Sequence, residues 1–263
     1  MEVDYYKKLF QTIGNIIELI EKDDIPKYLL FLENAFPYMD NYNYHKGMNG
    51  IIQELTGLLK TKNIGTDSDR ALLLDFQATL ETKPEKAIKL EKDALAQIET
   101  ITVDNARLVS NLHANLGGLY RMNGHPDLAR EHMEKSISLL DQFNLLHIND
   151  SIPQIANYAM FLTEQQEPER GISELQKLSG IIKEYHSDDC LDYAKVQETL
   201  GTIYLMTANL PQAKTHFKRA FKIYEKIWAD EPEMIEAKYQ EIQELYPQIG
   251  FCIGKNLSGL LTK

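Results

Sequence analysis

The residues best suited to chemistry are spread thinly along this chain. Seven histidines occur, and two of them, His132 and His216, lie 84 residues apart with Glu174 midway between them. A His-Glu-His set has the donor types that bind zinc. The three residues are spaced by 42, which is the length of the helical repeat described below, so each lies on a different helix. Packed helices stand about 10 Å apart, whereas zinc lies about 2 Å from each of its ligands. We therefore expect these residues to be exposed surface side chains and predict no metal site.

No motif of an enzyme accompanies them. The sequence lacks a glycine-rich phosphate loop, a His-Glu-x-x-His zinc motif and a Gly-x-Ser-x-Gly nucleophile motif. Cys190 and Cys252 form neither a disulfide framework nor a metal motif, and they are predicted to be buried thiols. This cysteine usage favours a reducing cytoplasm. We predict that the chain is not an enzyme and needs no cofactor.

Composition narrows the choice of partner. The 263 residues are 43% hydrophobic and 25% charged, and the formal net charge is −11. Nucleic-acid binding depends on Lys and Arg that neutralise phosphates, so an acidic chain is not expected to bind nucleic acid. No stretch approaches 18 consecutive apolar residues, and the acidic start at Met1 differs from a secretory signal, so we expect no membrane contact.

The strongest pattern is a repeat of 42 residues. Four stretches superimpose when the sequence is shifted by that distance, and each shift places similar residues in register: Leu74, Leu116, Tyr158 and Leu200; Ala78, Tyr120, Leu162 and Tyr204; Ala87, Ala129, Gly171 and Ala213. Three prolines follow the same period, namely Pro84, Pro126 and Pro168. A fixed period in this range indicates a stack of repeated helical units.

The motif within each period resembles the tetratricopeptide repeat. The best copies read Leu200-Gly201-Thr202-Ile203-Tyr204 followed by Ala213, Phe217 and Ala220, and Leu116-Gly117-Gly118-Leu119-Tyr120 followed by Ala129. This family has Leu-Gly-x-x-Tyr and then spaced Ala, Phe and Ala in a helix–turn–helix unit. The longer period is similar to that of kinesin light chains and bacterial relatives. The resemblance implies an all-α, right-handed solenoid of antiparallel helix pairs.

We divide the chain into three parts. Residues 1–64 are expected to form an N-terminal helical cap, and 25–62 can be interpreted as a degenerate first repeat. Residues 65–230 hold four repeats, with helix pairs expected near 66–99, 104–143, 149–186 and 189–229. Residues 231–263 are expected to form capping helices, and the alternative is that their apolar end docks on a second copy or on a partner.

The resemblance also implies where a ligand binds. In this family the first helix of each pair lines a concave groove, and the residue before the signature Leu faces into it; here these are Leu73, Asn115, Asn157 and Thr199. A carboxamide offers two donors and an acceptor, so it can pair with the main chain of an extended peptide. The further groove candidates are Gly118, Arg121, Met122, Met160, Lys195, Thr202 and Met206. The alternative is that Asn115 and Asn157 bond to neighbouring helices and only fix the stack.

These features predict a scaffold or adaptor that binds a protein or an extended peptide. One alternative is a peptide-sensing regulatory receptor, or a fragment of a larger signalling protein. Such receptors carry a DNA-binding or effector module at the N-terminus, yet residues 1–64 hold seven lysines against nine acidic residues, which is a poor composition for reading DNA.

Overall fold

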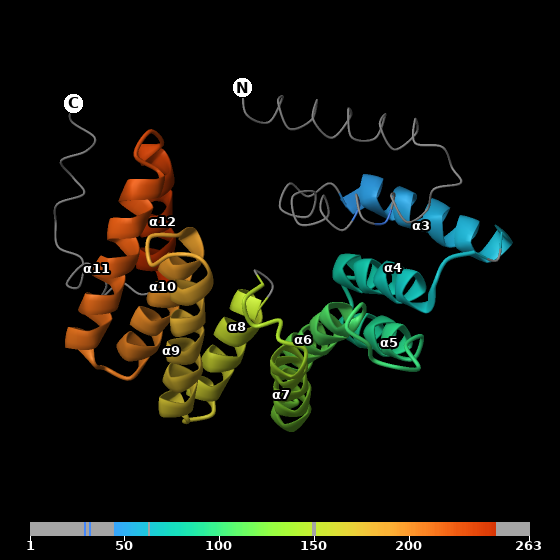
Figure 1. The fold of residues 1–263 in the computed structure, drawn as a ribbon, viewed down its shortest axis with the longest axis horizontal. Coiled ribbons are helices and arrows are strands. Elements are labelled where there is room, and N and C mark those ends of the chain that lie inside the picture. Colours follow the sequence, from blue (N-terminus) through green and yellow to red (C-terminus); the bar gives the residue numbers. More distant parts are fainter. Residues whose placement is uncertain (1–28, 30–31, 33–44, 63, 149–150, 246–263) are drawn as a thin grey trace. The chain divides into compact units, whose positions relative to one another are not determined.

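The structure, a computed structural model, describes residues 29, 32, 45–62, 64–148 and 151–245 (Figure 1). These residues form helices and no strand, which confirms the predicted all-α fold. The helices are α3 (His45–Lys62), α4 (Asp67–Leu80), α5 (Pro84–Leu95), α6 (Ala106–Met122), α7 (Pro126–Gln142), α8 (Ser151–Glu164), α9 (Pro168–Tyr185), α10 (Leu191–Met206), α11 (Leu210–Ile227) and α12 (Pro232–Leu245).

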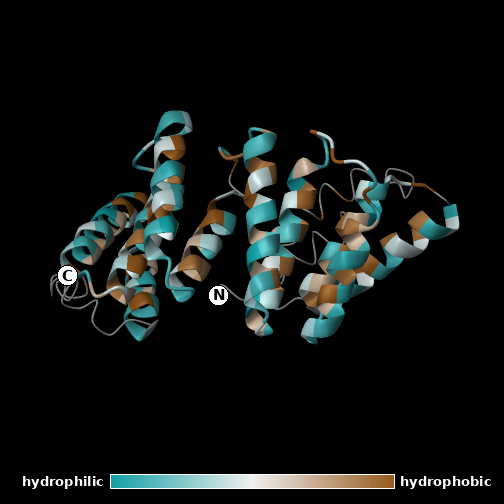
Figure 2. Cartoon of the chain, turned by 90° about the horizontal axis from the view of Figure 1, so that it is seen from below, coloured by the Kyte–Doolittle hydropathy of each residue, from teal (hydrophilic) through white to brown (hydrophobic). Residues whose placement is uncertain are grey.

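Helices occur at all four predicted positions, and packing between the two helices of a pair is seen for α4–α5, α8–α9 and α10–α11. In the predicted N-terminal helical cap the structure describes α3, and in the predicted C-terminal capping part it describes α12. Residues 1–28 and 246–263 of these two predicted parts lie outside the described residues. Hydrophilic and hydrophobic residues alternate along the helices, as one-sided burial requires (Figure 2).

Proline explains where the second helices begin. Pro84, Pro126 and Pro168 are the first residues of α5, α7 and α9, a position where the missing N–H costs no helical hydrogen bond. At α4 the start is fixed by a capping box. The Thr66 hydroxyl accepts from the Asp69 amide at 3.1 Å, and the Asp69 carboxylate accepts from the Thr66 amide at 2.6 Å.

The turns that end the first helices also repeat. Gly124, Gln166 and Ala208 lie 42 residues apart and all adopt left-handed backbone, with φ of 75°, 64° and 58°. The next amide then bonds to a carbonyl five residues back, as Asn209 does to Tyr204 at 2.8 Å. Gly124 adopts this conformation without cost, whereas a side chain at the other two positions opposes it.

The chain forms two compact units, residues 1–129 and 130–263, and the division falls within α7. In the first unit α3 packs on α4, α4 on α5 and α5 on α6. One core cluster joins α3 to α4 through Met48, Ile52, Leu55, Leu59, Leu73 and Phe76. A smaller one joins α4, α5 and α6 through Ala71, Ala94 and Leu112.

In the second unit α8 packs on α9, and α10 packs on α8, α9 and α11. Its large core runs from the end of α7 to α12 and includes Leu140, Ile155, Leu175, Leu200, Phe217 and Tyr224. The small signature residues are buried, as expected, and Gly171 and Gly201 lie where helices cross. Ala129 and Ala213 are fully buried. A Cβ atom on Gly201 would meet the Phe217 ring at 3.0 Å, and one on Gly171 would meet the Ala159 carbonyl oxygen at 2.6 Å.

Cys190 differs from its expected role as a buried thiol. It is a half-buried residue that caps α10, because its Sγ accepts a hydrogen bond from the Tyr193 amide at 3.4 Å. The thiol in turn donates to the Ser187 carbonyl at 3.2 Å. Its role is therefore to begin a helix, in the way that Ser does elsewhere. Cys252 lies outside the described residues.

Candidate functional site

Four groove candidates lie on α6 in the first unit. Gly118 and Arg121 are half-buried, and Met122 at the end of the helix is 83% exposed. Asn115 is half-buried and donates from Nδ2 to Oδ1 of Asp75 on α4 at 2.8 Å. This bond between two first helices is the stacking contact that the alternative interpretation anticipated. Contact between Asn115 and a peptide stays a prediction.

The remaining candidates lie on α8 and α10, which pack together in the second unit. On α8, Asn157 is exposed and Met160 is half-buried; within the part of the chain that the structure describes, the Asn157 carboxamide has no hydrogen-bond partner. On α10, Lys195 is exposed and forms an ion pair with Asp192 at 3.7 Å.

The other three α10 candidates differ in exposure. The half-buried Thr199 donates to the Lys195 carbonyl at 3.0 Å. Thr202 is buried, with 9% of its surface exposed, whereas Met206 is 43% exposed. Among these candidates Asn157, Lys195 and Met206 are therefore exposed, and Met160 and Thr199 are partly accessible.

A buried acidic pair lies beside Asn115, and sequence reasoning missed it. Glu91 on α5 is 1% exposed and Asp75 on α4 is 9% exposed. Oε2 of Glu91 has no hydrogen-bond partner among the described residues. A buried carboxylate without full pairing is costly, so such a group keeps its proton.

The electrostatics follow from this packing. Burial, then the charge of Asp75 and a hydrogen bond with Asp75, raise the pKa of Glu91 to about 10, and Asn115 opposes part of that shift. Near neutral pH Glu91 is therefore a neutral acid. It occupies the same place in the repeat as Met133, Leu175 and Phe217, which are all apolar.

The signal for this pair was present in the sequence. Asp75 stands where other copies have Gly117, Ala159 and Gly201, and Glu91 stands 16 residues later, as Phe217 does after Gly201. In the fourth copy these two positions touch, because Gly201 approaches the Phe217 ring. Two acidic substitutions at contacting positions of one copy thus predict a buried acidic pair.

A second polar network links α7, α8 and α9 in the second unit. Tyr158 is buried and donates from its hydroxyl to Glu134 at 2.8 Å. Arg130 pairs with Glu167 at 2.6 Å, and Arg170 pairs with both Glu167 and Glu134. Burial and the bond to Glu134 raise the pKa of Tyr158, and hydrogen bonds from Arg130 and Arg170 lower the pKa of Glu167. This network joins successive helix pairs and has no free reactive group.

The histidines do not lie as expected. Both His132 and His216 are half-buried, so the prediction of exposed side chains is wrong. Nδ1 of His216 donates to Oε1 of the buried Gln197 at 2.9 Å, and its ring stacks on Tyr204. Burial, and secondarily Arg219, lower the pKa of His216. The imidazole satisfies a buried amide, which explains why it is drawn inward.

The described residues also bear on two other classes of site. No group of three or more His, Cys, Asp or Glu side chains there is placed to hold a metal ion. None of the helices described is both long and apolar enough to cross a membrane.

Comparison with known proteins agrees with the helix-pair architecture. Residues 151–226 match the tetratricopeptide repeat family. The chain is similar to the crystal structure of BtubC (BKLC) from P. vanneervenii, with a TM-score of 0.55, 17% identity, and coverage of 86% of this chain and 84% of that one. It is also similar to a Podosopora anserina putative kinesin light chain with nearly identical TPR-like repeats, with a TM-score of 0.56, 15% identity, and coverage of 75% and 96%. No curated protein matches the chain in sequence.

The resemblance seen in the sequence is thereby confirmed. Residues 151–226 carry tetratricopeptide repeats, and the chain has the helix-pair fold of the TPR-like structures to which it is similar. Folds of this class serve in general as scaffolds for protein interaction, because stacked helix pairs present an extended surface.

Proposed function

We propose that this protein is a scaffold or adaptor, not an enzyme, that holds an extended peptide segment of a protein partner along the first helices of its repeats. Asn157 carries the proposal. It occupies the position before the signature residue Tyr158, it is exposed on α8, and its carboxamide is unpaired within the described residues. An exposed carboxamide at that place can pair with both an N–H and a C=O of a peptide main chain.

The neighbouring side chains support the same reading. Thr199 takes the position on α10 that Asn157 takes on α8, so polar groups recur on adjacent first helices. Met160 and Met206 supply flexible apolar surface that adapts to different side chains. Lys195 is exposed and can pair with an acidic group of the ligand, since its ion pair with Asp192 at 3.7 Å is a weak surface contact.

The acidic charge bears on the class of partner, and the cysteines bear on the compartment. A net charge of −11 disfavours nucleic acid as the partner. The thiol of Cys190 is free and half-buried, which fits a reducing compartment such as the cytoplasm. The C-terminal apolar end, for which we proposed capping or pairing with a second copy, lies outside the described residues.

Asn157 and Asn115 offer a matched pair of variants. The partner is first identified by cross-linking from cells and purified. Its affinity for wild type, Asn157→Ala and Asn115→Ala is then measured by titration, together with unfolding in urea. We expect Asn157→Ala to weaken binding about twofold to tenfold through one lost hydrogen bond, with the free energy of unfolding within about 0.5 kcal/mol of wild type.

Asn115→Ala is the control for stacking. It removes the bond to Asp75 beside buried Glu91, so we expect it to lower stability. Unchanged affinity in Asn157→Ala, with stability also unchanged, would show that the peptide does not use this face of α8.

A further inference from the structure

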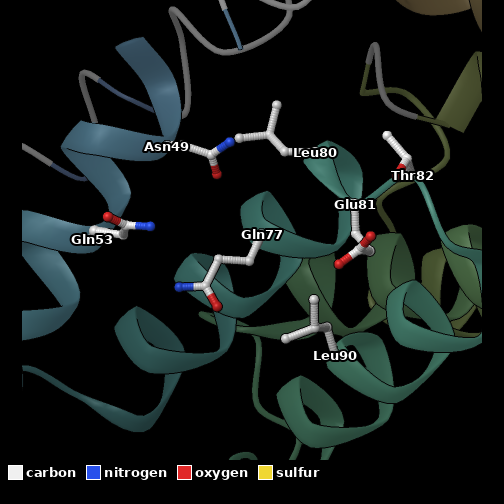
Figure 3. A pocket seen from close by; sticks show the side chains of 7 residues that line it. All are labelled: Asn49, Gln53, Gln77, Leu80, Glu81, Thr82 and Leu90. Atoms are coloured by element: carbon white, nitrogen blue, oxygen red, sulfur yellow. The ribbon is translucent and has the colours of Figure 1, made fainter. Parts of the chain in front are cut away.

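A pocket of about 400 Å³ lies among α3, α4 and α5 in the first unit (Figure 3). Three carboxamides line it: Asn49 and Gln53 from α3, and Gln77 from α4. We call it the amide pocket. It does not include the groove candidates on α6, so it is a different surface from the one they define.

The carboxamides retain most of their hydrogen-bonding capacity. Asn49 and Gln53 are exposed and form no hydrogen bond with any other residue that the structure describes. Gln77 donates one bond from Nε2 to the Thr56 hydroxyl at 3.3 Å, which leaves its carbonyl oxygen and its second N–H available. Three such groups around one pocket can together accept from the N–H groups and donate to the C=O groups of an extended main chain.

The other lining residues define the charge of a ligand. Glu81 is the charged residue of the pocket, and one of its oxygens, Oε1, accepts from the Lys83 amide at 3.0 Å. No Lys or Arg is among the lining residues of this pocket. Leu80 and Leu90 add a short apolar wall, against which an aliphatic stem can lie while its charged end reaches Glu81.

We propose that the amide pocket binds a peptide segment that carries a lysine or arginine, with the carboxamides on its main chain and Glu81 on its cation. The proposal rests on the proposed function in that the segment belongs to a protein partner. It adds a second binding site for the partner, and this site prefers a segment with a cationic side chain. The overall charge of −11 acts in the same direction, because it attracts cationic segments.

The test observes the pocket directly in the full chain. The probes are capped Ser-Ala-Lys-Ala-Ser peptides and matched peptides with arginine, norleucine or glutamate in the central position. In a ¹⁵N-labelled sample, the side-chain NH₂ signals of Asn49, Gln53 and Gln77 are followed during titration. We expect the lysine and arginine peptides to shift these signals, the norleucine peptide to bind more weakly, and the glutamate peptide to have no effect.

Variants separate the main-chain contacts from the charge contact. Gln53→Leu is expected to weaken the lysine peptide about threefold to tenfold. Glu81→Gln is expected to remove the preference for lysine over norleucine. Gln176→Leu changes an exposed glutamine on α9 in the other unit and should have no effect. Equal shifts with lysine and glutamate peptides, or no shift up to the solubility limit, would overturn the proposal.

The two proposals fail separately. If Asn157→Ala weakens the cross-linked partner while Gln53→Leu and Glu81→Gln bind it normally and no peptide shifts the pocket signals, the amide pocket alone is wrong. If the lysine peptide shifts the pocket signals but Asn157→Ala leaves partner affinity unchanged, the peptide-binding role of α8 is wrong and the amide pocket stands.

Discussion

Replacing Glu91 with glutamine is expected to stabilise the first unit, and the gain should grow as the pH rises. Glu91 is almost completely buried against Asp75, and its Oε2 lacks a partner among the described residues. Glutamine has the same shape as the neutral acid and can still donate to a carboxylate, but it never needs to lose a proton. In the variant no proton has to be taken up at position 91 when the chain folds, and the packing around the side chain is unchanged.

The sign and size follow from proton linkage. Glu91 has a pKa of about 10 in the folded chain against an ordinary value of 4.5, so the folded state binds the proton more tightly. Its contribution to stability is complete below pH 4.5 and is lost as the pH rises toward 10. One proton taken up on folding gives a slope of at most about 1.4 kcal/mol per pH unit, or about 4 kcal/mol between pH 5 and 8.

The assay is urea unfolding of wild type and Glu91→Gln from pH 5 to 8, with hydrogen exchange of α4 and α5 amides as a local measure. Asp93→Asn, at an exposed position of the same helix, is the control and should keep the wild-type pH dependence. If wild type and Glu91→Gln have parallel pH profiles, or if Glu91→Gln is less stable at pH 8, the argument from a buried shared proton is wrong.

Three further substitutions test a helix crossing, a left-handed turn and a polar network. Ala213→Leu, which places a large side chain at a fully buried helix crossing, should lower the free energy of unfolding by about 1–3 kcal/mol, and an unchanged melting temperature would contradict the packing role. Ala208→Gly should stabilise the chain by up to about 1 kcal/mol in urea unfolding, because φ is 58° there; a loss of stability would show that the left-handed turn carries no strain. Tyr158→Phe should cost about 0.5–3 kcal/mol by removing the bond to Glu134, and an effect near zero would make that network incidental.

The fold was predictable because repetition tests each assignment several times. A single Leu-Gly-x-x-Tyr motif is weak evidence, but Leu116 and Leu200 recur in register with two more copies. Proline at the start of α5, α7 and α9 then sets the helix boundaries from local chemistry alone. Periodicity also placed the buried Ala129 and Ala213, because small residues at equivalent positions must meet a close neighbour.

The candidate site was predictable only in part. Position in the repeat assigned Asn115 and Asn157 the same role, yet Asn115 donates to Asp75 whereas Asn157 is exposed. The difference arises from the residue on the preceding first helix, which a pattern read along one helix does not include. The amide pocket was missed for a similar reason, because Gln77 comes from a different helix than Asn49 and Gln53 and has no periodic relation to them.

The sequence by itself determined the repeat length, the helix pairs and the small residues between them, since these follow from local propensity and a period that every copy obeys. Only the tertiary structure decided the state of the polar side chains. Glu91 is a neutral buried acid because of its burial and the charge of Asp75, and His216 lies inward because Gln197 needs a donor. Charge and hydrogen bonding depend on distances across helices, and those distances exist only once the helices have packed.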